Sequence, residues 1–145
     1  MEPIHYILIN ANILASLGIL HTYWLLGGKH SIEYFFPANS PFRKKNIKPK
    51  KLKMFLTSLL LFFMAFFFVE QMAGFTKIFN ADAFKWGNKI ITVIFVLRAF
   101  GNFTYVGFTK SFKKGTFAKL DTYLYSPVCL LIAALAYLLS LTPFV

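Results

Sequence analysis

The chain has 145 residues, of which 57% are hydrophobic, and it contains 19 phenylalanines. A soluble domain of this length cannot bury so much apolar surface, so the composition predicts one domain embedded in a membrane. A secreted disulfide scaffold is excluded because Cys129 is the only cysteine. The formal net charge is +11, but fifteen of the sixteen Lys and Arg residues lie between apolar segments or at their ends. That placement favours lipid headgroups over nucleic acid as the partner of the charge.

Four segments are long and apolar enough to span a bilayer, which takes about 20 residues. In chain order they cover residues 4–27, 52–75, 89–108 and 122–142. The first is the most polar, the second is mostly leucine and phenylalanine, and the third carries Arg98 near its middle. Because no strand pattern or internal repeat is present, we predict an all-α fold. We expect a transmembrane four-helix bundle with short interfacial loops, formed as a single domain by residues 1–145.

The connecting loops differ in their content of lysine and arginine. Residues 29–53 hold eight of them and residues 110–119 hold four, whereas residues 77–89 hold three. Basic loops stay on the cytoplasmic side of a membrane. The first and third loops are therefore predicted to be cytoplasmic, with both termini outside.

Arg98 is the most informative residue inside a predicted span. An ionisable group there costs roughly 2.5–3.5 kcal/mol, so it needs a partner within the protein. At about 100° per residue, Gly101, Asn102 and Tyr105 share its face of the helix. This polar face is expected to point toward the other helices.

Two other spans offer matching polar faces. On the first, Asn10 and His21 are eleven residues apart and lie on one side, and Trp24 follows His21 by three residues. On the fourth, Asp121 and Tyr125 share a face. By depth, Asn10 falls in the outer half, and the others fall in the cytoplasmic half.

These residues have two interpretations. In the structural one, Arg98 pairs with Glu70 or Asp121, and the remaining polar groups fix the packing of the helices. Asn10 and Glu70 are expected to serve only this structural purpose. In the functional interpretation, the cytoplasmic half holds a pocket for a small ligand. Its predicted lining residues are His21, Trp24, Arg98, Asn102, Asp121 and Tyr125.

Catalytic and metal motifs are missing from the sequence. The histidines are poorly spaced for a metal, since His5 precedes His21 by sixteen residues and His30 lies in a loop. The chain has no phosphate-binding loop, serine nucleophile motif or paired carboxylates, so hydrolase and kinase functions have no support. We predict no metal site, and neither a cofactor nor a catalytic residue can be named.

Three stretches together resemble an uncharacterised family of small bacterial four-span membrane proteins, a domain of unknown function. They are HTYWLLGG at residues 21–28, RAFGNF at residues 98–103 and FAKLDTYLYSPVCL at residues 117–130. The resemblance implies a four-span fold in the bacterial inner membrane and brings no established activity. It also implies that five residues act as a set: His21, Trp24, Arg98, Asp121 and Tyr125.

The leading functional hypothesis is an inner-membrane protein that binds a small anionic or amphipathic ligand, or a lipid, in a cytoplasm-facing polar pocket. One alternative is an accessory subunit of a larger inner-membrane complex. Another is a membrane enzyme that acts on a lipid, with His21 or Asp121 as the proton carrier. The expected partners are membrane lipids and, in the subunit alternative, other membrane proteins.

Overall fold

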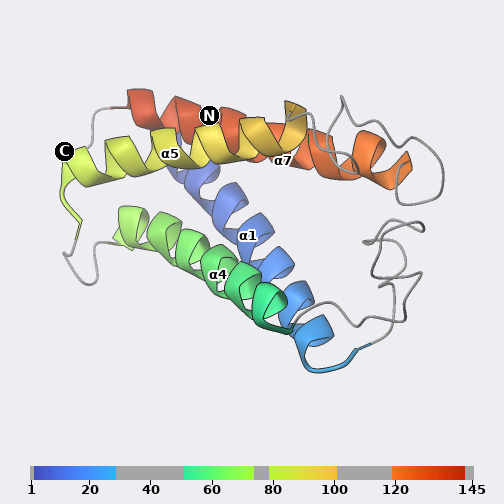
Figure 1. Cartoon of the computed structure of the whole chain (residues 1–145). Helices are drawn as coiled ribbons and strands as arrows, with labels where there is room; N and C mark the ends of the chain where they lie inside the picture. Colours follow the sequence, from blue (N-terminus) through green and yellow to red (C-terminus); the bar gives the residue numbers. More distant parts are fainter. Residues whose placement is uncertain (1, 29–50, 74–78, 101–118, 143–145) are drawn as a thin grey trace.

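A computed structural model describes residues 2–28, 51–73, 79–100 and 119–142. Within these ranges the chain is all-α, as predicted, and contains no strand. The helices are α1 (Pro3–Leu25), α4 (Lys51–Ala73), α5 (Ala81–Phe100) and a last helix that contains a π-helix, η1 (Asp121–Tyr125), followed by α7 (Ser126–Leu141) (Figure 1).

The helices pair into two antiparallel hairpins. In one hairpin α1 packs along α4, and in the other α5 packs along α7. Contacts between α1 and α7 join the hairpins. We call the end that carries Pro3, Ala73, Ala81 and Leu141 the terminal end, and the opposite end, which adjoins the two lysine-rich loops, the basic end. Figure 1 shows the two hairpins diverging from the terminal end toward the basic end.

Among the described residues, three helices are long and apolar enough to cross a membrane. They are Pro3–Leu25, Lys51–Met72 and Asp121–Leu141. The fourth helix, α5, is less apolar because it contains Asp82, Lys85, Lys89 and Arg98. The chain thus has the helices of a membrane protein, with one markedly more polar than the others.

The position of α5 differs from the predicted third span. The helix begins at Ala81 rather than near residue 89, and it ends, within the described residues, at Phe100. A local cap explains the early start: the side-chain Oδ1 of Asn80 accepts a hydrogen bond of 2.8 Å from the Ala83 backbone N–H. Within the described residues, Arg98 lies in the last turn of α5. Residues 101–108 of the predicted span lie outside the described residues.

The core lies between the hairpins and is apolar. Leu14 of α1, Phe68 of α4 and Ile132 of α7 are fully buried in one continuous cluster. The opposite side of α4 exposes large apolar side chains, including Phe63 and Phe66. A helix that is apolar all round suits a lipid environment, where the outward side chains meet acyl chains.

Polar contacts between the hairpins lie toward the terminal end. Asn10 of α1 donates from Nδ2 to the Ile132 carbonyl of α7 at 3.4 Å. Asn88 of α5 donates from Nδ2 to Oε1 of Gln71 on α4 at 3.3 Å. The Phe67 ring of α4 also packs against Phe84 of α5, with ring centroids 5.4 Å apart. This end therefore acts as the joint between the hairpins.

Toward the basic end, the described polar contacts stay within one hairpin. Thr22 of α1 and Ser58 of α4 are joined by a hydrogen bond of 2.6 Å between their hydroxyl groups. Arg98 of α5 pairs with Asp121 at the start of the last helix. Each hairpin is thus held together separately where the two diverge.

Candidate ligand site at the basic end

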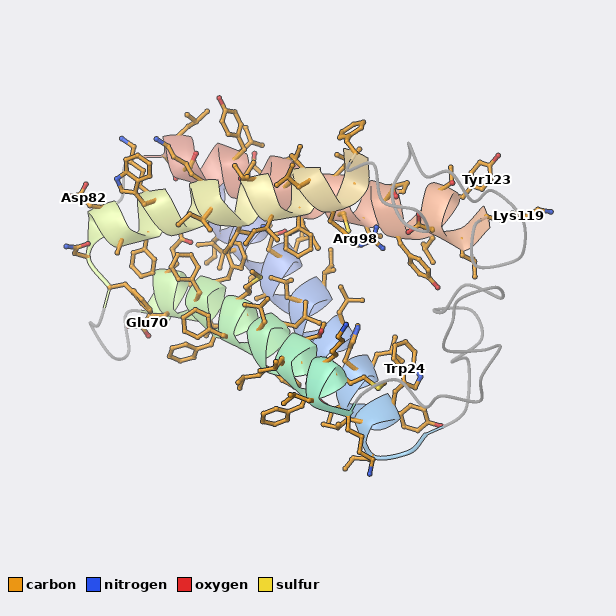
Figure 2. The ribbon with its side chains drawn as sticks, in the orientation of Figure 1. Trp24, Glu70, Asp82, Arg98, Lys119 and Tyr123 are labelled. Atoms are coloured by element: carbon orange, nitrogen blue, oxygen red, sulfur yellow. The ribbon has the colours of Figure 1, made fainter. Side chains whose placement is uncertain are left out.

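The ion pair of Arg98 with Asp121 is the centre of the candidate site. Arg98 Nη2 lies 3.0 Å from Asp121 Oδ1. The carboxylate is fully buried, whereas the Arg98 side chain retains 34% of its exposed surface. The pair neutralises a carboxylate that would otherwise be buried with its charge, and it ties α5 to the last helix. Of the two carboxylates expected as partners, Asp121 is the one found, and Figure 2 shows Glu70 at the other end of the molecule.

The π-helix brings Asp121 into position. The Ser126 backbone N–H donates to the Asp121 carbonyl, which closes a turn one residue longer than an α-turn. Five residues then make about one full turn, so Asp121 and Ser126 lie on the same side of the helix. In an unbroken α-helix they would be about 140° apart. Both residues are fully buried, so the longer turn places the carboxylate on the buried face of the helix.

Pro127 accounts for the position of the π-helix. It occupies the first turn of α7, has no N–H to donate, and in a regular helix its ring would collide with the Tyr123 carbonyl four residues earlier. A wider turn over Asp121–Tyr125 removes this collision while the chain remains helical. The sequence around the proline therefore determines where the carboxylate faces.

Polar groups surround the pair on the last helix. Tyr125 and Cys129 both lie near enough to Asp121 for an electrostatic interaction, and Cys129 is also within the influence of Arg98. The Ser126 hydroxyl is buried and has no hydrogen-bond partner among the described residues. Arg98 Nη1 is likewise buried without such a partner. Within the described part of the chain, the site thus contains two polar groups with unused hydrogen-bonding capacity.

A second group of predicted residues lies on α1. The His21 and Trp24 rings pack edge to face, with centroids 5.3 Å apart. His21 Nδ1 lies 2.8 Å from the Leu17 carbonyl oxygen. A carbonyl only accepts, so Nδ1 must carry the proton, which leaves Nε2 as the ring nitrogen available for another contact. Trp24 is buried, whereas His21 is half-buried.

Helical geometry turns both groups toward the space between the hairpins. On α1, Asn10 contacts α7, and His21 follows eleven residues later, about 20° round the helix. On α5, Gly87 faces the Phe67 ring of α4, and Arg98 also follows eleven residues later. His21 and Arg98 therefore face the opposing hairpin from the two sides. Figure 2 shows Arg98 on the side of its hairpin that faces α1.

The remaining predicted residues have different outcomes. Asn102 lies outside the described residues, so its expected place in the lining stays a prediction. Asn10 and Glu70 lie in the terminal half and are buried, and the purely structural part expected of them stays a prediction. Ser126 and Asn88 were not singled out from the sequence. The early helix start at Asn80 is the signal that could have placed Asn88 inside a helix.

Comparison with known proteins identifies the chain by family. No curated protein and no solved structure matches it. One family covers residues 14–136, a range that includes α1 from Leu14 onward, α4, α5 and most of the last helix. His21, Arg98 and Asp121 all fall within that range. The chain therefore belongs to DUF3995, a family of proteins of unknown function.

Proposed function

We propose that the protein is a multi-pass protein of the bacterial inner membrane that binds a small anionic or amphipathic ligand between its hairpins at the basic end. This end faces the cytoplasm and both termini lie outside. Arg98 is the principal binding residue, with Asp121 as its resting counter-ion. His21 contacts the same ligand from the opposite hairpin.

One observation carries the proposal: only one nitrogen of the Arg98 fork has a partner among the described residues. Nη2 contacts Asp121 at 3.0 Å, whereas the buried Nη1 has no partner there. A buried donor without an acceptor costs about 1–3 kcal/mol, and more when it is charged. An oxygen atom from a ligand removes that cost, because a planar guanidinium can bind two acceptors at once.

The charge around the site favours an anion. The two loops next to the basic end contain twelve lysine and arginine residues in the segments 29–53 and 110–119. Each basic residue near a membrane surface attracts anionic groups by roughly 1 kcal/mol. Asp121 balances Arg98 alone, and Glu33 is the one acidic residue within these two segments, so a large positive charge remains. An anion is therefore concentrated at the mouth of the site before it reaches Arg98.

Native mass spectrometry of the gently extracted protein tests the proposal. The wild type should carry a stoichiometric small-molecule adduct, and Arg98→Lys should keep the fold but lose most of it, because lysine lacks the planar fork. Lys85→Ala, near the terminal end of α5, is the matched control and should keep the adduct. An adduct retained equally by Arg98→Lys would overturn the assignment.

The same measurement separates the rival functions. A protein partner in fixed ratio, with no small-molecule adduct, contradicts the ligand proposal and supports an accessory subunit. A lipid that is released as a chemically altered product supports a membrane enzyme instead.

A further inference from the structure

The donors at the basic end favour a particular ligand chemistry. Arg98 Nη1 is a cationic donor, and the Ser126 hydroxyl can donate from a fully buried position one turn beyond Asp121. Two donors from different helices suit a group with several acceptor oxygens, such as a phosphate.

An apolar track leads away from Arg98 along α5. Ile94 and Ile90 precede Arg98 by four and eight residues, and they are 41% and 58% exposed. They lie about 6 and 12 Å from the level of Arg98 toward the terminal end. Half the hydrocarbon core of a bilayer is about 15 Å thick. The track therefore has the length and direction of an acyl chain whose headgroup lies at the level of Arg98.

We infer that the ligand is a glycerophospholipid of the leaflet at the basic end. Its phosphate binds Arg98 Nη1 and the Ser126 hydroxyl, and one acyl chain lies along Ile94 and Ile90. The inference rests on the proposed function, because it names the ligand of the same site. A free phosphate shares the headgroup chemistry but makes no use of the apolar track.

Two variants one residue apart test the track. Ile94→Asn places an amide on the side of α5 that carries Arg98, whereas Val93→Asn places it about 140° away from Arg98 round the helix. Both side chains are exposed, at 41% and 56%, so neither substitution disturbs the core. Ile94→Asn should weaken phospholipid binding about tenfold, and Val93→Asn should leave it unchanged. Equal effects of the two variants would overturn the acyl-chain placement.

A second experiment tests the ligand itself on delipidated full-length protein. It measures adducts and the melting temperature in the presence of phosphatidylglycerol, inorganic phosphate or oleate. The phospholipid should bind with 1:1 stoichiometry and raise the melting temperature, and Arg98→Lys or Ser126→Ala should weaken it. The other two probes should bind at least tenfold more weakly. If inorganic phosphate or oleate binds as tightly and depends on Arg98, the anion site stands and the phospholipid inference fails. If none of the three probes binds, both fail.

Discussion

The two ends of the molecule use buried polar residues differently. Toward the terminal end, Asn10 and Asn88 reach across from one hairpin to the other. Toward the basic end, Thr22 and Arg98 bond within their own hairpins. The terminal end is therefore a joint, whereas the basic end consists of two separately stabilised arms. Such an arrangement allows the arms to accept a ligand between them without breaking the contacts that hold the fold.

The difference extends to the backbone. Among the described residues, the departure from α-helical hydrogen bonding within the long helices is the π-turn at Asp121–Tyr125, which lies at the basic end. π-turns frequently occur at functional sites, because the extra residue changes which side chains share a face. Here it moves a carboxylate next to Arg98. The fold thus accepts an irregular turn at the arm that carries the charged pair, and the joint is built from regular helices.

The largest expected effect concerns the orientation of the two ends. Glu2→Cys and Lys48→Cys, each in a Cys129→Ala background, should label oppositely with a membrane-impermeant maleimide on intact cells. Glu2→Cys should react, because both termini are predicted outside, and Lys48→Cys should react only after permeabilisation. Labelling of Lys48→Cys from outside would place the basic end, and with it the proposed site, on the external side.

The next largest effect concerns the hairpin of α5 and α7, which carries the ion pair. Arg98→Ala leaves the fully buried Asp121 carboxylate without its counter-ion, so it should destabilise the protein by about 3–5 kcal/mol. Thermal unfolding in detergent measures the loss. Lys85→Ala, an exposed site on the same helix, should have little effect. Combining Arg98→Met with Asp121→Leu should restore much of the stability, since neither charge of the pair then remains.

An unchanged melting temperature in Arg98→Ala would mean that water or lipid headgroups already compensate the carboxylate. The pair would then contribute nothing to the difference between the two ends.

The helices could be predicted from the sequence because a long apolar segment within a lipid bilayer forms an α-helix. The segments around α1, α4 and α7 agree with their predicted spans to within about two residues. The face shared by Asn10 and His21 also follows from spacing alone. For Arg98, the sequence offered two carboxylate partners and could not choose between them. That choice depends on which helix α5 packs against, and helix pairing is a tertiary property.

Two features could not be read from hydropathy. The start of α5 depends on one capping hydrogen bond at Asn80, and the charges that follow it lower the apolar signal of the helix. The π-turn depends on a single extra residue per turn, and its signal in the sequence is Pro127, six residues after the buried carboxylate of Asp121. Hydropathy averages over about 20 residues, so it cannot resolve either feature.

Replacing Pro127 tests the part of the π-turn in the site. Pro127→Ala removes the collision that the wider turn relieves, so the segment should return to a regular α-helix of unchanged length and turn Asp121 by about 100° relative to α7. The pair with Arg98 would then be lost, at a cost on the order of 2 kcal/mol, because the rotated carboxylate is less buried. Tyr123→Ala, at an exposed position within the turn, keeps Pro127 and is the control. If Pro127→Ala and Arg98→Ala have additive effects on the melting temperature, the turn does not position Asp121.

A smaller effect compares a glycine-to-alanine substitution at the joint with one inside the first hairpin. A Cβ at Gly87 of α5 would overlap the Phe67 ring of α4. That ring also packs against Phe84 of α5, which limits its movement. Gly87→Ala should therefore cost about 1–3 kcal/mol through overpacking at the joint. At Gly18, within the first hairpin, a Cβ would lie 3.1 Å from the Phe62 ring, which is partly exposed and can move. Gly18→Ala should be nearly neutral, because alanine also favours the helix by about 1 kcal/mol.

The smallest expected effect compares two asparagines on α1. Asn10 donates across the joint to the Ile132 carbonyl, whereas Asn12 is exposed and donates to the Leu8 carbonyl of its own helix at 2.8 Å. Asn10→Ala should lower the stability by about 0.6–1 kcal/mol, the usual worth of an interhelical hydrogen bond in a membrane protein. The loss is limited because Asn10 Oδ1 has no partner among the described residues, so its removal offsets part of the cost. Asn12→Ala should not destabilise the protein, and equal melting temperatures for the two variants would show that the joint is held by apolar packing alone.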